Sequence, residues 1–219
     1  MGNPKHIIYR ISGMGADQRL FSGIESIKGY EFVDLEWQEF PNIKTLNDYA
    51  VEIAEQIDTS KPFSLLGVSM GGMVCSELTD ILNPEKVVII SSAKTSKELP
   101  AQLNQLKFMS VTGMLNNGVI RFFLENSSHF FGEMNKNQRK LFYEMIESTS
   151  INFIVWSIKA ILNWDKKTAD SKIIHIHGDN DFVIPIYNLS PTITIKKGDH
   201  MMVWNKSELI NQQLKEIFR

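Results

Sequence analysis

Residues 67–72, with the sequence GVSMGG, constrain the fold of this chain more than any other stretch. They follow the apolar run FSLL at 63–66 and precede a helical pattern over 73–78. A strand that turns sharply into a helix needs residues without a Cβ where its two arms approach each other. Gly67 and Gly71, two positions before and two after Ser69, meet that need. The stretch therefore predicts a strand–turn–helix unit with Ser69 at its apex.

Such a turn has a chemical consequence for Ser69 and its neighbour. It lifts the Ser69 hydroxyl above the strand ends and leaves the Met70 N–H at a helix N-terminus. This is the arrangement of a nucleophile elbow, in which the N–H faces the position where an oxyanion would form. The pentapeptide alone also fits an ordinary glycine-rich turn. The interpretation therefore depends on what the rest of the chain supplies.

Composition excludes several other classes of protein. A chain of 219 residues that is 43% hydrophobic and 22% charged is typical of one globular domain. The net charge of −2 gives no electrostatic case for a nucleic acid or a membrane as partner. The single cysteine, Cys75, excludes an internal disulfide and is expected to be a buried structural thiol. No signal peptide or membrane-spanning run is recognised, so we expect a cytoplasmic protein.

Strand and helix patterns alternate along the chain. Strands are predicted near 6–11, 31–35, 63–66, 86–90, 172–177 and 193–195. Helices are predicted from 46, after a capping-box spacing of Thr45 and Asp48, and over 207–218. Alternation of this kind is typical of right-handed βαβ units and a doubly wound, mostly parallel sheet.

Residues 95–171 differ from the rest because they are helix-patterned and rich in Phe and Met. We expect a single domain whose core comprises 1–94 and 172–219, with 95–171 inserted as a helical lid. The large apolar side chains of the lid either pack between its helices or make an apolar, adaptable pocket for a small hydrophobic substrate. They are Phe108, Met109, Met114, Phe122, Phe123, Phe130, Phe131, Phe142, Met145, Phe153 and Trp156.

A serine nucleophile needs a base to take its proton and a third group to orient that base. On a parallel sheet these groups lie at the carboxyl ends of strands. The fifth predicted strand ends in HGDNDFVIP at 177–185, and the sixth is followed by GDHMMVW at 198–204. These segments supply Asp181 and His200, in the order Ser, Asp, His.

ISGMG at 11–15, GVSMGG, HGDNDFVIP and GDHMMVW together resemble the α/β-hydrolase superfamily over nearly the whole chain. The likeness is greatest to small serine hydrolases of the esterase and lipase-like kind. It implies that Ser69 is the nucleophile, Asp181 the orienting acid and His200 the base. It also implies that the N–H groups of Met14 and Met70 form the oxyanion hole, and that no metal or organic cofactor is required.

The sequence departs from the family pattern in two places. The usual His-Gly of the oxyanion loop is Ser12-Gly13 here. The chain also begins at what would be the third strand of the family, so we expect a trimmed sheet of about six parallel strands.

Other acids compete with Asp181 for its role. Asp179 lies two positions earlier, but the resemblance favours Asp181, and Asp179 is expected to brace the turn. Asp199 is adjacent to His200 and is interpreted as a loop acid, because neighbouring residues rarely present side chains to each other. Residues 91–94, where some relatives carry the acid, contain no carboxylate.

Two histidines lie on the fifth predicted strand. His175 and His177 are expected to be hydrogen-bonded structural residues. A metal site built from His177, Asp179, Asp181 and His200 is a rival interpretation, but it would leave the turn at Ser69 unexplained.

The resemblance implies hydrolysis of an ester-like bond in a small apolar substrate through an acyl-enzyme. The same fold also serves thioesterases, lactonases, carbon–carbon bond hydrolases, aminopeptidases and cofactor-free haloperoxidases. Some relatives instead use the pocket as a small-molecule receptor that passes its signal to a protein partner. The complete Ser69, Asp181 and His200 set favours an enzyme.

Overall fold

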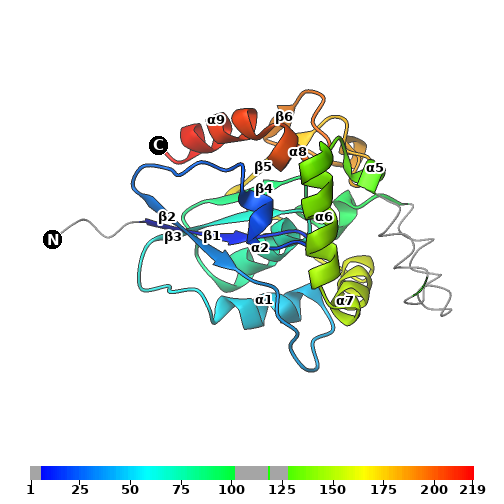
Figure 1. The fold of residues 1–219 in the computed structure, drawn as a ribbon. Helices are drawn as coiled ribbons and strands as arrows, with labels where there is room; N and C mark the ends of the chain where they lie inside the picture. The colour runs from blue at the N-terminus through cyan, green and yellow to red at the C-terminus, as the bar shows by residue number, and fades with distance from the viewer. Residues whose placement is uncertain (1–5, 102–117, 119–127) are drawn as a thin grey trace.

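The computed structural model describes residues 6–101, 118 and 128–219. Six parallel strands form one sheet in the order β2-β1-β3-β4-β5-β6 (Figure 1). This confirms the predicted doubly wound sheet of about six parallel strands. The strands are β1 (His6–Ile11), β2 (Tyr30–Leu35), β3 (Phe63–Val68), β4 (Val87–Ile90), β5 (Ile173–Gly178) and β6 (Ile193–Ile195).

The winding direction reverses between β1 and β3, which are neighbours in the sheet although β2 lies between them in the chain. At such a switch point the connections that leave the two strands diverge to opposite faces, and a crevice opens at the carboxyl ends of the strands. The loop after β1 and the turn after β3 therefore lie beside each other at this edge of the sheet.

Helices cover both faces of the sheet (Figure 1). Helices α1 (Leu46–Ala54) and α2 (Met70–Ile81) pack on one face. The short η1 (Gln18–Phe21), α8 (Met202–Asn205) and α9 (Ser207–Ile217) pack on the other. In β4, Val87 and Ile89 contact the first layer while Val88 and Ile90 contact the second. A strand buried on both faces is expected to be apolar throughout, as β4 is.

Between β4 and β5 the described residues form η2 (Ser96–Glu98), α5 (Ser128–Phe131), α6 (Lys136–Ser148) and α7 (Ile151–Leu162), with no strand among them. A further short helix, η3 (Ile186–Asn188), follows β5. Figure 1 shows α5, α6 and α7 at the carboxyl end of the sheet. The division into core and lid stays a prediction. Five residues predicted for the lid lie outside the described residues: Phe108, Met109, Met114, Phe122 and Phe123.

In the part of the chain that the structure describes, no single helix is long and apolar enough to cross a membrane. Helices α6 and α7 together have the length and apolar composition of a membrane span, but the pair is bent by 96°.

The capping box predicted at the start of α1 is confirmed, and Asp17 caps the start of η1. Thr45 Oγ1 accepts the Asp48 N–H at 3.0 Å, and Asp48 Oδ2 accepts the Thr45 N–H at 3.0 Å. Asp17 accepts the Arg19 N–H at 2.9 Å at the start of η1. These side chains satisfy N–H groups that have no partner within the helix itself.

Replacement of Thr45 by alanine should lower the free energy of unfolding by about 1 kcal/mol, because the Asp48 N–H then loses its acceptor. Thr45→Ser keeps the hydroxyl and should stay within about 0.3 kcal/mol of the wild-type protein. Urea unfolding of the three proteins measures both values. Equal losses for the two variants would contradict the role given to the hydroxyl.

Candidate active site

Ser69 lies at the turn between β3 and α2 in a strained backbone conformation, with φ 54° and ψ −122°. A conformation of this kind costs a residue with a Cβ about 1–3 kcal/mol. The glycines on either side explain how the turn closes. A Cβ on Gly67 would lie 2.5 Å from the Gly71 carbonyl oxygen, and a Cβ on Gly71 would overlap the carbonyl oxygens of Ile11 and Ser12. At both positions the neighbouring backbone leaves room only for glycine.

Hydrogen bonds hold Ser69 in this conformation. Its N–H donates to the Ile90 carbonyl at 3.0 Å, and its carbonyl accepts the Gly72 N–H at 2.9 Å. The Ser92 hydroxyl donates to the same carbonyl at 2.7 Å. Sequence reasoning missed Ser92, because only the register of β3 against β4 places it beside the turn.

The structure brings together the three side chains predicted from the ends of β3, β5 and β6. His200 Nε2 lies 3.0 Å from Ser69 Oγ, and His200 Nδ1 lies 2.8 Å from Asp181 Oδ2. Asp181 and His200 are each 4% exposed, whereas Ser69 is partly exposed. Ser69 is therefore more open to solvent than the two groups behind it.

Asp181 is held as an acceptor. Its Oδ1 accepts the N–H groups of Val183 at 2.8 Å and Ile184 at 2.9 Å, and its Oδ2 faces His200. Burial alone raises the pKa of the Asp181 carboxyl. The charge and hydrogen bond of His200, with the Ile184 N–H, outweigh burial and hold that pKa below its ordinary value. The carboxylate form therefore persists at neutral pH.

The two competing acids make other contacts. Asp179 accepts the Lys197 N–H at 2.5 Å and so braces the turn after β6. Asp199 accepts the N–H groups of Glu133 at 2.8 Å and Met201 at 2.9 Å. The Asp199 contacts tie the loop that carries His200 to the residues just after α5.

The loop after β1 lies against Ser69, since a Cβ on Gly13 would be 3.3 Å from Ser69 Cβ. The Gly13 carbonyl accepts the Ala16 N–H at 3.1 Å and the Trp37 indole N–H at 3.0 Å. In a trans peptide the N–H of the following residue points away from the carbonyl. The Met14 N–H therefore points away from Ala16 and Trp37. Ser12, which replaces the usual histidine, donates its hydroxyl to the Ala16 carbonyl at 2.8 Å.

No protein-family model and no curated protein matches the sequence. Solved structures do match. An esterase from Exiguobacterium antarcticum has a TM-score of 0.74 and 17% identity, with 99% of this chain and 92% of that chain covered. The chain has the α/β-hydrolase fold.

Two further structures show how widely this fold is used. A carboxylesterase from the thaumarchaeon Nitrososphaera gargenis has a TM-score of 0.73 and 13% identity, with 100% of this chain and 92% of that chain covered. A proposed non-heme bromoperoxidase from Mycobacterium tuberculosis has a TM-score of 0.67 and 15% identity, with 99% of this chain and 93% of that chain covered. The α/β-hydrolase fold alone therefore does not select the reaction.

A small apolar pocket of about 20 Å³ lies between the loop after β1 and the helices α5, α6 and α7. The Phe131 ring, which lines the pocket, lies 5.9 Å from the His200 ring. Ile146 packs against Gly15, since a Cβ there would be 3.5 Å from Ile146 Cγ1. The pocket is lined by Met14, Gly15, Phe131, Phe142, Ile146 and Ile154.

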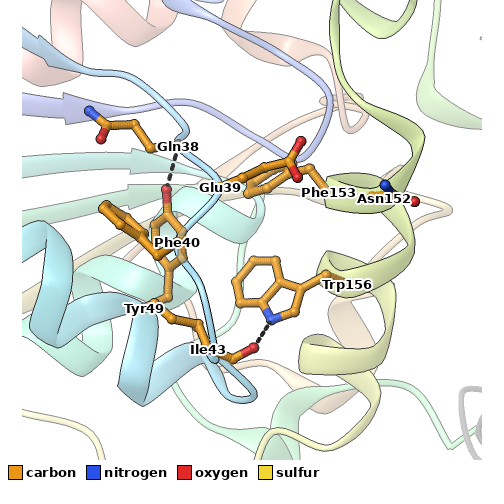
Figure 2. Close-up of a pocket in the computed structure, with 8 residues that line it drawn as sticks. All are labelled: Gln38, Glu39, Phe40, Ile43, Tyr49, Asn152, Phe153 and Trp156. Atoms are coloured by element: carbon orange, nitrogen blue, oxygen red, sulfur yellow. Dashed lines mark hydrogen bonds between the residues drawn. The ribbon is translucent and has the colours of Figure 1, made fainter.

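A larger cavity of about 200 Å³ lies between the loop after β2 and α7, and none of the three side chains lines it (Figure 2). The Tyr49 hydroxyl accepts the Gln38 N–H at 3.0 Å, and the Trp156 indole N–H donates to the Ile43 carbonyl at 2.9 Å. Burial raises the pKa of Tyr49 to about 12, so it stays a neutral phenol. These contacts fix the loop whose Trp37 supports Gly13.

Several other predicted features can be placed in the structure. Cys75 is buried, as expected, and burial raises the pKa of its thiol. His175 and His177 form a buried hydrogen-bonded pair on β5. Within residues 6–101, 118 and 128–219, no group of three or more His, Cys, Asp or Glu side chains is arranged to hold a metal ion.

Gly71→Ala should lower the free energy of unfolding by about 3 kcal/mol or more, because its Cβ would meet two backbone carbonyls that cannot rotate away. Gly13→Ala is the matched control. Its Cβ meets a side-chain atom at 3.3 Å and should cost at most about 1 kcal/mol. Denaturant unfolding compares the two, and similar losses would refute the steric account of the turn.

Proposed function

We propose that the chain is a serine hydrolase that cleaves an ester-like bond of a small apolar substrate through an acyl-enzyme. The observation that carries the proposal is the continuous hydrogen-bonded chain from Ser69 through His200 to Asp181, with distances of 3.0 and 2.8 Å. The strained turn and the esterase names of structural neighbours support it.

In the first step His200 Nε2 takes the Ser69 proton while Oγ bonds to the substrate carbonyl carbon. The carbonyl oxygen becomes an oxyanion, and the N–H groups of Met14 and Met70 are its proposed donors. His200 then gives its proton to the leaving alcohol, and the bond between that alcohol and the acyl group breaks. Asp181 keeps the imidazole in the tautomer that presents Nε2 to serine and stabilises its cationic form.

In the second step a water molecule takes the place of the alcohol. His200 removes a proton from the water as the water oxygen bonds to the acyl carbon. Collapse of the tetrahedral intermediate breaks the bond to Ser69 Oγ, which recovers the proton from His200. The products are a carboxylic acid and free enzyme, and this sequence of steps uses no metal or organic cofactor.

The apolar pocket beside Met14 suits the acyl part of the substrate. Its walls come from the loop after β1 and from α5, α6 and α7, and they carry no charged side chain. The small volume favours a short acyl chain over a long one. In this proposal the segment 95–171 supplies the wall and lid of the site.

Ser69→Ala should lower kcat for p-nitrophenyl acetate by about 10⁴- to 10⁶-fold, because the nucleophile is lost while folding is kept. A fluorophosphonate probe should label the wild-type protein at Ser69 and leave the variant unlabelled. Ser157→Ala is the control, since the buried Ser157 hydroxyl has no partner among the described residues. Folded wild-type protein that neither turns over an ester and thioester panel nor takes the label would favour a receptor.

Ile146→Ala should shift the chain-length preference toward longer esters. Removal of the side chain opens the pocket beside Gly15, and each methylene newly buried is worth about 0.8 kcal/mol, or about 4-fold in kcat/KM. The measurement is the ratio of kcat/KM for p-nitrophenyl hexanoate to that for the acetate. Val155→Ala on α7, outside the pocket lining, should leave the ratio unchanged. An unchanged ratio in Ile146→Ala would place the acyl chain elsewhere.

A further inference from the structure

The buried pair His175 and His177 occupies positions that core packing alone would fill with apolar side chains. Both are 0% exposed, and with Ile173 they share one face of β5. Ile173 belongs to the hydrophobic core on that face. An imidazole placed there must find hydrogen-bond partners to offset the loss of hydration. Its contacts therefore indicate what the pair does.

His177 contacts the residues that surround the Asp181 carboxylate. His177 Nε2 lies 2.8 Å from the Ile184 carbonyl oxygen and 3.5 Å from Asp181 Oδ2. The Ile184 N–H donates to Asp181 Oδ1 at 2.9 Å. Ile184 is thus held at both ends of its backbone, by the carboxylate and by His177. The loop from Asp181 to Ile184 closes around the carboxylate because of these contacts.

The hydrogen-bond chemistry fixes the proton positions in the pair. A carbonyl oxygen only accepts, so His177 Nε2 carries the proton and donates it to Ile184. His177 Nδ1 is then an acceptor, and His175 Nε2, 3.1 Å away, donates to it. In this arrangement His175 Nδ1 carries no proton, and it makes no hydrogen bond of ordinary geometry among the described residues, although a backbone contact with Ser92 favours a proton on the His175 ring. Each ring therefore carries a single proton in a single arrangement.

The surroundings favour this neutral form. Burial lowers the pKa of His177, and the charge of the Asp181 carboxylate offsets only part of that shift. Burial, with the neighbouring His177 and Lys94, lowers the pKa of His175 to about 3. Besides Lys94 and Asp181, His200 also faces the pair, from the far side of Asp181. The proton order in the pair is therefore preserved through the neutral range.

We infer that His177 is a positioning residue: held as its Nε2–H tautomer by His175, it clamps Ile184 and thereby aims the Asp181 carboxylate at His200. The inference rests on the proposed hydrolase function for its kinetic consequence, but the clamp itself is a property of the folded protein. A displacement of about 1 Å in such a group lowers the rate of the chemical step by about 10²-fold.

Two amide variants separate the clamp from simple core packing. In His177→Gln the amide nitrogen occupies the place of Nε2 and still donates to Ile184, whereas the shorter amide of His177→Asn mimics Nδ1 and cannot reach Ile184. Expected results are a kcat within about 3-fold of wild type for His177→Gln and about 10- to 100-fold lower for His177→Asn, with KM little changed in both. Equal kcat values in the two folded variants would overturn the inference.

Nuclear magnetic resonance tests the clamp without reference to activity. The far-downfield proton resonance of His200 Nδ1–H, which reports its hydrogen bond to Asp181, should keep its position in His177→Gln and shift or broaden in His177→Asn. An identical resonance in both variants would also overturn the inference. If wild-type protein hydrolyses no ester, the proposed function fails, but this comparison still decides the role of His177.

A measurement on the wild-type protein covers the case in which a variant does not fold. Two-dimensional ¹H–¹⁵N spectra of the imidazoles at neutral pH should show His177 as the neutral Nε2–H tautomer. The His175 ring should show the same tautomer. A protonated Nδ1 on His177 would refute the inference.

Discussion

The structure depends on one close approach of backbone to backbone, where the start of α2 passes the end of β1. Any side chain at Gly71 would overlap the carbonyl oxygens of Ile11 and Ser12. Because the helix begins so close to the switch point of the sheet, Ser69 is forced into a positive φ and its hydroxyl projects from the turn. The loop after β1 is brought against the serine by the same contact. The proposed nucleophile and the proposed oxyanion loop are thus both positioned by one packing constraint.

The remaining groups depend on the topology of the parallel sheet. Asp181 and His200 lie 112 and 131 positions from Ser69 in the chain, yet β3, β5 and β6 end at the same edge. Burial of a carboxylate there is unfavourable by itself, and it is offset by His200 and by the N–H groups of Val183 and Ile184. The orientation of Asp181 is therefore a property of its whole loop and of His177 beneath it.

Much of this could be predicted from the sequence, because the patterns are local. The glycines around Ser69, the continuous apolar run of β4 and the capping box at Thr45 each reflect contacts within a few residues. Contacts between distant segments left no such pattern. Ser92 supports the Ser69 carbonyl through strand register, and Trp37 reaches Gly13 from another loop. The pocket beside Ile146 depends on how α6 crosses the sheet edge, which periodicity does not specify.

Departures from ordinary local rules gather at one edge of the sheet. Among the described residues, the non-glycine positions with positive φ are Asn42, Ser69, Ser91 and Lys197, and each lies in the segment that follows a strand. The Ser91 hydroxyl, which has no partner among these residues, directly follows β4, and the buried His177 lies near the end of β5. A fold selected for stability alone has no reason to collect strain and buried polar groups in one place. Their position where strands end, as Ser69 does, argues for function at this edge independently of any likeness to known esterases.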